Sequence, residues 1–295
     1  MARTRRIKCS DRDALYHVTS RIAGRMMLLA GAVIKDDMLD ALERSAEFSG
    51  VNVAAFAIMD NHFHIVLQIP VLSGPLPENE VIRRYGMLKG GKASLRLEER
   101  LEALRKRGDK VSADAILGGL RRRMHDLSQF VKTFKEEFGR LFRSRSPFPG
   151  TLWEGRFRST LIGESEYLRR CAAYVEMNPV RAGIASRSEG YAWNTVGAAR
   201  RGRAFAVRCR KWILSILGVS TGDSPLVSTE DSPLGEGRIA QISGGVIIGS
   251  AEFVTEMLRR FSEKVRSRSA RARAVEGMGY ASHGWKLVAR KENAA

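Results

Sequence analysis

The chain is short of acidic residues, and this shortage narrows the choice of partners. Its 295 residues include 32 Asp and Glu against 50 Lys and Arg, which leaves a net charge of +18. The excess gathers in basic clusters at residues 121–123, 200–211 and 259–273. A surplus of that size favours a polyanionic partner, with nucleic acid first, over a merely basic soluble surface.

Cysteine is scarce as well, and long apolar runs are missing. Cys9, Cys171 and Cys209 are odd in number and far apart, which argues against a disulfide framework and a zinc ribbon and fits a reducing cytosol. The basic N-terminus, MARTRRIKCSDRD, is not followed by the apolar core of a signal peptide, and MMLLAGAVI is too short to cross a bilayer. We therefore expect a cytoplasmic protein.

The pattern of apolar residues predicts an α+β fold. Strands are expected at 14–22, 51–59 and 62–69, and a further strand follows a loop within 144–162. Helices are expected at 35–48, at 94–107 inside a charged insertion spanning 70–112, over 113–142, and around Tyr174. The first six elements of this β-α-β-β-α-β-α order match the ferredoxin-like (RRM-like) fold, an antiparallel sheet with helices on one face.

The predicted domain organisation has three parts. Residues 1–200 form the main domain, and residues 201–237 form a basic segment and a linker rich in turn-forming residues. Residues 238–295 form a mainly helical, basic C-terminal region, which we expect to add DNA affinity.

Two histidines stand on one strand. His62 and His64 follow a predicted tight turn at Asp60-Asn61, and side chains two apart on a strand share a face. Phe63, Ile65, Leu67 and Ile69 would then face the core, which leaves both imidazoles on the polar side. Gln68 shares that side but lies farther along and is a weaker ligand candidate. A His-x-His pair alone favours a structural role over a metal site, and the position of both imidazoles on the polar face of an apolar strand strengthens the case for the metal site.

The helix around Tyr174 carries a polar stripe beside its buried one. Its members, at spacings of three and four residues, are Tyr167, Arg170, Tyr174 and Asn178. Pro179 disfavours helical geometry at Asn178, so the amide is expected at the helix end. Two imidazoles, an amide oxygen and a phenol are the groups that metal-assisted attack on a phosphodiester needs. Taken alone, Tyr174 fits an amphipathic edge residue better than a nucleophile.

Four segments together carry a family resemblance: MDNHFHIVLQ, LWEGRFRS, YVEMNPVRAGI and GYAWNT, in that order. They resemble the single-tyrosine transposases of the HUH nuclease superfamily, in the branch of REP-associated tyrosine transposases, over roughly residues 10–200. The resemblance implies that His62, His64 and Asn178 bind a divalent metal, Mg²⁺ or Mn²⁺, and that Tyr174 is the nucleophile, with Tyr167 as the alternative.

The resemblance also implies a reaction and a substrate. Tyr174 would nick single-stranded DNA through a 5′-phosphotyrosine intermediate and later rejoin strands, acting on hairpin-forming palindromes at the bacterial nucleoid. Arg170 is expected to assist Tyr174, and the further candidates for contact with DNA are Trp153, Arg156 and Arg158. A catalytically silent DNA-binding repressor on the same fold and an RNA-binding module are the alternatives. Whether the protein is a monomer or a homodimer stays open.

Overall fold

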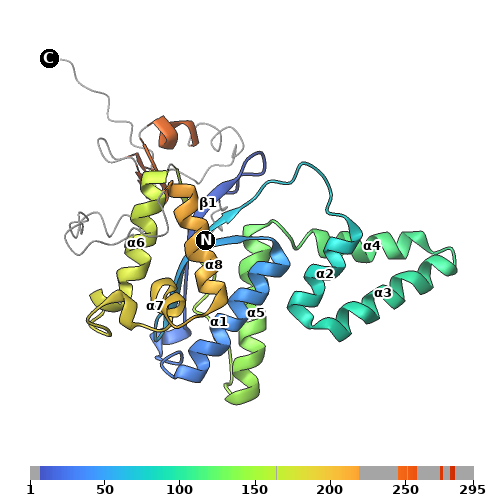
Figure 1. Ribbon diagram of the computed structural model, residues 1–295, viewed down its shortest axis with the longest axis horizontal. Coiled ribbons are helices and arrows are strands. Elements are labelled where there is room, and N and C mark those ends of the chain that lie inside the picture. Colours follow the sequence, from blue (N-terminus) through green and yellow to red (C-terminus); the bar gives the residue numbers. More distant parts are fainter. Residues whose placement is uncertain are drawn as a thin grey trace.

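Four antiparallel strands and two helices form the centre of the molecule, in the chain order β1-α1-β2-β3-α5-β4 (Figure 1). The computed structural model describes residues 7–163, 165–218, 245–250, 252–257, 273–274 and 280–282. Its strands are β1 (Ala14–Arg21), β2 (Asn52–Ile58), β3 (His62–Ile69), β4 (Arg158–Ile162), β5 (Gly245–Ile248), β6 (Arg273–Ala274) and β7 (Tyr280–Ser282). Its helices are α1 (Ala32–Ser49), α2 (Glu78–Lys89), α3 (Gly91–Lys106), α4 (Lys110–Arg121), α5 (Leu127–Arg145), α6 (Ser165–Arg181), α7 (Thr195–Arg200) and α8 (Ala204–Leu217), with short 3₁₀ turns η1 (Ala23–Arg25) and η2 (Ser188–Gly190).

The order of the strands confirms the predicted ferredoxin-like sheet. β3 pairs with β2 and β1, and β1 pairs with β4, each time antiparallel. The turn between β2 and β3 is closed by a hydrogen bond from Met59 N to His62 O of 2.8 Å. Buried Lys35 of α1 forms an ion pair with Asp60 of this turn at 2.6 Å. This ion pair ties the start of β3 to the core.

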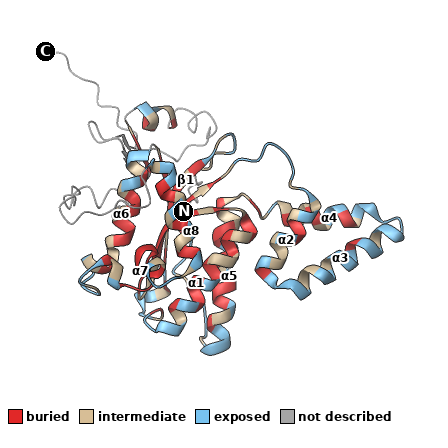
Figure 2. Ribbon diagram, in the orientation of Figure 1, coloured by how far each residue is buried: buried red, intermediate tan, exposed pale blue. Residues whose placement is uncertain are grey.

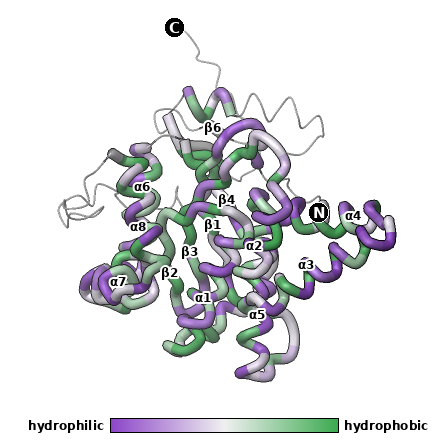
Figure 3. Tube along the Cα trace, turned by 45° about the vertical axis from the view of Figure 1, so that its right-hand side comes forward, coloured by the Kyte–Doolittle hydropathy of each residue, from purple (hydrophilic) through white to green (hydrophobic). Residues whose placement is uncertain are grey.

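One face of the sheet packs against α1 and α5, whose buried sides face the strands in Figure 2. The alternation predicted for β3 is confirmed, because Phe63, Ile65, Leu67 and Ile69 are all buried in this core. The predicted apolar stripe of α5 is buried there too; its members are Leu127, Val131, Phe134 and Phe138. In Figure 3 the apolar strands lie at the centre, inside a shell of helices.

The single helical region predicted over 113–142 is two helices. α4 ends at Arg121 and α5 begins at Leu127, with His125 between them in the left-handed region at φ 50°. The Asp126 side chain accepts a hydrogen bond from Gln129 N at 2.9 Å and so caps α5. The prediction was wrong here because the apolar stripe continues across a break that only the capping residue marks.

The other face of the sheet is also covered, so the expectation of helices on one face holds for α1 and α5 alone. α6 packs on β2 and β3 on that face. α8 covers the β2 edge, with Phe205 and Cys209 in the core shared with α1 and α5 and Ile213 in the core shared with α6. Residues 204–217 were expected as a basic segment leading into a linker, yet they form α8, with buried Phe205, Cys209 and Ile213. This second layer is what brings a helix to the side of the sheet that carries the histidines.

Helices α2, α3 and α4 extend away from the sheet as an arm (Figure 1). They share a small core of their own, which includes Val81, Leu101 and Leu117 and is closed by Phe48 of α1. Arg105 of α3 forms an ion pair with Glu78 of α2. The arm occupies residues 78–121, so it ends later than the insertion predicted at 70–112.

The GYAWNT segment fastens α6 to the sheet. Asn194 is fully buried; its amide donates to Glu176 O and Ser188 O, and its oxygen accepts from Gly197 N at 2.7 Å. A Cβ built on Gly197 would lie 1.9 Å from Tyr191 O, so only glycine fits there. These contacts give the segment a structural role.

The described part of the C-terminal region contains both a helix and strands. Residues 252–257 are helical as expected, and β5 extends the sheet by pairing parallel to β4, followed by β7 and β6. Residues 219–237 of the predicted linker and most of the basic cluster over 259–273 lie outside the described residues. No helix in the described ranges is long and apolar enough to span a membrane.

Candidate active site

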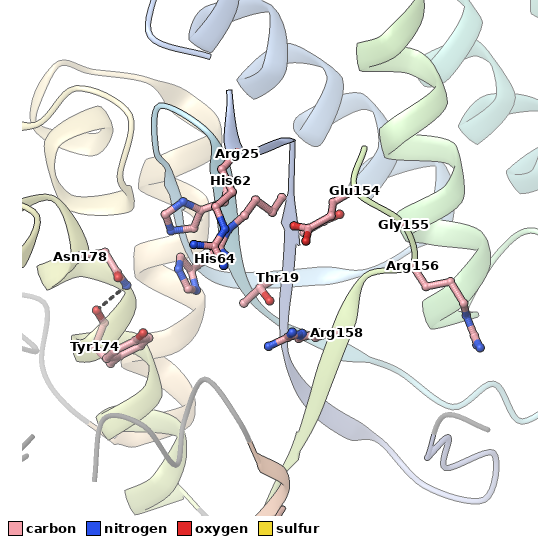
Figure 4. Close-up of a pocket in the computed structure, with 12 residues that line it drawn as sticks. Thr19, Arg25, His62, His64, Glu154, Gly155, Arg156, Arg158, Tyr174 and Asn178 are labelled. Atoms are coloured by element: carbon pink, nitrogen blue, oxygen red, sulfur yellow. Dashed lines mark hydrogen bonds between the residues drawn. The ribbon is translucent and has the colours of Figure 1, made fainter. Parts of the chain in front are cut away.

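A cleft of about 460 Å³ opens between α6 and the part of the sheet where β1 ends and β3 begins (Figure 4). It brings together the two predicted histidines, the tyrosine and the asparagine, although β3 and α6 are far apart in the sequence. Its lining residues are Thr19, Ser20, Arg21, Arg25, His62, His64, Glu154, Gly155, Arg156, Arg158, Tyr174 and Asn178.

The two imidazoles lie on the same face of β3, as the strand spacing predicts. The ring centroids of His62 and His64 are 5.0 Å apart, with the rings at 78° to each other. Thr19 and Arg21 of β1 stand opposite them in the sheet register. Two nitrogen donors therefore face one cleft from one strand.

A hydrogen-bond chain sets the tautomer of His62. Asn61 Nδ2 donates to Arg25 O at 3.1 Å, so the other amide atom of Asn61 is its oxygen. That oxygen lies 2.7 Å from His62 Nδ1, which must therefore carry the proton and donate it. His62 Nε2 is left with its lone pair, and a neutral imidazole held in this way is the form in which histidine binds metals.

His64 has an equivalent partner that sequence reasoning missed. Its Nδ1 lies 2.9 Å from Nε2 of His17 on β1, and both side chains are buried. The two rings are stacked at 5.2 Å and 7°. If His64 Nδ1 donates to His17, the Nε2 atom of His64 keeps a lone pair. The signal was present in the sequence, because His17, Thr19 and Arg21 alternate along β1.

Burial keeps both candidate ligands neutral. Desolvation, with a smaller contribution from Arg21, lowers the pKa of His62 to about 4. Desolvation, followed by the charge of His17, lowers the pKa of His64 well below its ordinary value. At neutral pH neither imidazole has to lose a proton before it can bind a cation.

Asn178 faces the cleft from α6, but the helix does not end there as expected. α6 continues through Pro179 to Arg181. Pro179 has no N–H, so the helical hydrogen bond to Val175 O is missing. Asn178 Nδ2 donates to Tyr174 O at 2.9 Å and lies 3.5 Å from Val175 O. With its nitrogen turned to the helix, Asn178 offers its side-chain oxygen to a ligand.

Tyr174 lies beside the histidines. Its ring centroid is 5.7 Å from that of His64, in an edge-to-face arrangement, and the residue is buried. The guanidinium of Arg181 lies 5.2 Å from the centre of the Tyr174 ring. Nucleophile and ligand candidates thus share one small space.

Arg170, expected to assist Tyr174, has other partners. It forms an ion pair with Glu166 at 2.8 Å, and its guanidinium lies over the ring of Tyr167. Neither Arg170 nor Tyr167 lines the cleft. The cation beside Tyr174 is Arg181, seven residues further along the helix and therefore on the same side of it.

The candidate DNA-contacting residues of the LWEGRFRS segment do not all face the cleft. In Figure 4 the Arg158 guanidinium lies within the cleft, whereas the Arg156 side chain points away from the histidines. Trp153 lies outside the cleft and packs edge-on against Phe63 at 5.6 Å. Sequence reasoning missed Arg21 and Arg25, which also line the cleft; Arg25 has a positive φ of 57°, an uncommon conformation for a non-glycine residue.

The donor set of the cleft fits a divalent metal ion. No group of three or more His, Cys, Asp or Glu side chains that could hold a metal occurs in the part of the chain described, so a set of three protein ligands requires the Asn178 oxygen. Two neutral imidazoles with one amide oxygen suit several divalent ions and leave coordination positions for a substrate.

Glu176 lies between Tyr174 and Asn178 in the sequence but is completely buried. Neither of its carboxylate oxygens has a hydrogen-bond partner among the described residues. Desolvation raises the pKa of Glu176 to about 8, although Arg210 acts in the opposite direction. The carboxyl group is therefore protonated in the folded protein at pH 7.

This pKa predicts a stability that falls as the pH rises. Between about pH 4.5 and about pH 8 the unfolded chain loses the Glu176 proton while the folded chain keeps it. The free energy of unfolding should therefore fall by up to about 1.4 kcal/mol per pH unit in that window. Glu176→Gln should remove this slope, which urea denaturation at a series of pH values measures. Equal slopes in the two proteins would contradict the assignment.

Comparison with solved structures gives a distant likeness. No protein-family model matches the chain, and no curated protein sequence matches it. The chain is similar to a solved structure described as "Structure of the REP associates tyrosine transposase bound to a REP hairpin". The two are 15% identical, with a TM-score of 0.42, over 68% of this chain and 87% of that chain. The function is therefore inferred from the residues and geometry of the cleft.

Proposed function

We propose that the protein nicks and rejoins single-stranded DNA in a metal-dependent reaction with Tyr174 as the nucleophile, as a transposase of the HUH type. The observation that carries this proposal is that β3 and α6 bring the predicted histidines, tyrosine and asparagine into one cleft. The Tyr174 and His64 rings lie 5.7 Å apart, and His62 and Asn178 line the same cleft. A purely structural tyrosine has no need of two neutral imidazoles and an amide oxygen beside it.

The ligand roles follow from the hydrogen bonds. With His64 Nδ1 as the donor to His17, the atoms left for a metal are Nε2 of His62, Nε2 of His64 and Oδ1 of Asn178. A divalent ion held there, Mg²⁺ or Mn²⁺, would polarise the scissile phosphate as a Lewis acid. Asn61, His17 and the helix backbone at Tyr174 orient the three side chains.

One P–O bond forms for each P–O bond that breaks, so the reaction needs no external source of energy. Tyr174 Oη attacks phosphorus and forms one P–O bond, while the bond from phosphorus to the 3′ oxygen breaks. The phenol loses a proton and the departing oxygen gains one, which leaves a 3′-hydroxyl and a 5′-phosphotyrosine. Attack of a 3′-hydroxyl on that linkage reverses the step and joins strands, so no nucleotide cofactor is required.

Positive charge supports both the nucleophile and the substrate. A phenol has a pKa of about 10, so its anion needs a nearby cation, and Arg181 lies against the Tyr174 ring. Arg21, Arg25 and Arg158 line the cleft and suit a phosphodiester backbone. The net charge of +18 acts at longer range by attracting DNA. Hairpin-forming palindromes are the substrate that the motif resemblance implies.

A denaturing gel tests the proposal. Single-stranded DNA incubated with the full-length protein and Mn²⁺ should yield a protein–DNA adduct that survives denaturation. Binding without an adduct would instead support the silent repressor.

His17 is expected to act on the metal through His64. His17→Leu removes the acceptor for His64 Nδ1 and should weaken Mn²⁺ binding by about 10- to 100-fold. His17→Gln retains an acceptor oxygen and should stay near wild type. Titration calorimetry measures the affinity, and circular dichroism checks the fold. Equal losses of Mn²⁺ affinity in both variants would show that His17 acts through packing alone.

A further inference from the structure

A second groove of about 570 Å³ lies beside the cleft, between α5 and the loop that precedes β4. The two hollows share Gly155 and Arg156 in their linings. Lys135 of α5 stands at this junction, where its Nζ donates to Gly155 O at 3.0 Å and to Ser20 Oγ at 3.1 Å. A chain-like ligand could therefore pass from one hollow into the other.

The floor of this groove is apolar. It is formed by Val131 of α5 with Leu152, Trp153 and Phe157 of the loop. Val131, Leu152 and Phe157 are buried in the main core and hold the floor in place. Trp153 is the half-buried aromatic residue of the floor, and Lys135 Nζ lies 4.7 Å from the centre of its ring. A rigid apolar and aromatic surface suits the flat faces of unpaired bases.

The rim of the groove is cationic. Lys132, Lys135 and Arg143 lie at helical spacings on one side of α5 and extend over about 16 Å. Arg156 adds a charge from the opposite wall, and Glu136 is the acid in the lining. Charges spaced along a hollow follow a phosphate backbone rather than a single anion.

Gly139 sits in the interior of α5 at the same groove. Glycine lowers the stability of a helix relative to alanine, and here packing does not require it. A Cβ built on Gly139 would meet only the Arg143 side chain, at ordinary contact distances of 3.5 Å or more. The missing side chain therefore leaves room in the lining of the groove.

We propose that the groove binds the single DNA strand where it continues from the cleft, next to the scissile phosphate. The inference rests on the proposed function and extends it by giving the substrate strand a path. Duplex DNA fits less well, because its bases are stacked inside the helix and would leave the apolar floor uncovered.

Paired charge variants test the inference in the full-length protein. Lys132→Gln/Arg143→Gln removes two exposed rim cations, and Lys92→Gln/Arg100→Gln removes two exposed cations from α3 as the control. Fluorescence anisotropy measures the affinity for oligothymidylates of about 4 to about 20 nucleotides as a function of salt.

The rim variant should lose affinity for the longer strands only. Its log–log salt slope should be smaller by about 1.4, at about 0.7 for each lost phosphate contact, so the affinity gained between about 1 M and about 0.1 M salt is about 25-fold smaller. The α3 variant should match the wild type. Equal losses of affinity in both variants would show that net charge is the cause and would contradict binding in the groove. A loss confined to duplex stems would overturn the single-strand assignment.

Variants of Gly139 separate binding from folding. Gly139→Ala should raise the melting temperature with little effect on binding. Gly139→Leu, which fills the groove, should weaken binding of the long strands about as much as the rim variant does. Unchanged binding in Gly139→Leu would contradict the proposal, and if that variant fails to fold, the rim variant decides.

Adduct formation on a strand short enough to occupy only the cleft distinguishes the two proposals. It should be unchanged in the rim variant. No adduct in the wild-type protein refutes the tyrosine chemistry whatever the groove binds, whereas an adduct with unchanged long-strand affinity in the rim variant refutes the groove alone.

Discussion

Tyr174→Phe is expected to abolish the covalent protein–DNA adduct while leaving DNA affinity unchanged. The substitution removes only the phenolic oxygen and keeps the ring against His64 and Arg181. Loss of a nucleophile should lower the rate of adduct formation by at least about a thousandfold. The rate is measured by denaturing electrophoresis of timed samples, and the affinity by fluorescence anisotropy.

Tyr167→Phe is the matched control. Tyr167 lies on the same helix but outside the cleft, beside Arg170. Its substitution should leave the rate of adduct formation close to wild type. An adduct retained by Tyr174→Phe and lost by Tyr167→Phe would reverse the assignment of the nucleophile.

Loss of any one proposed metal ligand is expected to weaken Mn²⁺ binding by more than about 100-fold. His62→Ala and His64→Ala each remove a neutral nitrogen donor, and Asn178→Ala removes the oxygen donor. Calorimetric titration with Mn²⁺ in the absence of DNA measures this effect independently of turnover. The three losses should be similar in size, because each variant removes one of the three proposed donors from the same cleft.

Gln68→Ala is the control for the ligand variants. Gln68 shares the histidine face of β3 but accepts a hydrogen bond from Asn52 Nδ2 at 2.9 Å and does not line the cleft. It should bind Mn²⁺ as the wild type does. Wild-type affinity in His62→Ala or in Asn178→Ala would remove that residue from the ligand set.

The strand bearing the histidines could be predicted closely from sequence because its signals are local. The alternation from His62 to Ile69 separates core from cleft, and the Asp60–Asn61 turn marks where the strand begins. The same rule applied to β1 would have placed His17 on the histidine face. Alternation within one strand, however, does not reveal which strand lies beside it, so the contact between His17 and His64 could not be predicted from β1 alone.

The helix bearing Tyr174 was harder to predict in detail. Pro179 would be expected to end the helix, yet α6 continues to Arg181. The Asn178 side chain donates to Tyr174 O and lies 3.5 Å from Val175 O, the carbonyl that the proline leaves without a helical partner. Helical spacing predicts Arg170 as the cation beside Tyr174, yet Arg170 forms an ion pair with Glu166, one turn earlier. Such choices among nearby charges depend on which face is buried, and tertiary packing decides that.

The covering of both faces of the sheet was not predictable from the order of elements. α8 has a basic exposed side, which made residues 204–217 resemble the start of a linker. Its buried Phe205, Cys209 and Ile213 become meaningful only when β2 is known to lie beneath them. The many basic residues of such a helix indicate its exposed side, whereas the face that it buries depends on its neighbours in the fold.

The central claim is that Tyr174 takes the 5′-phosphate of a nicked single strand. It is tested most directly by labelling one oligonucleotide at either end and incubating it with the protein and Mn²⁺. The 3′-end label should migrate with the protein, on the peptide that contains Tyr174, while the 5′-end label appears on a shorter strand with a 3′-hydroxyl. No adduct, an adduct that carries the 5′-end label, or a linkage to a residue other than Tyr174 would contradict the account.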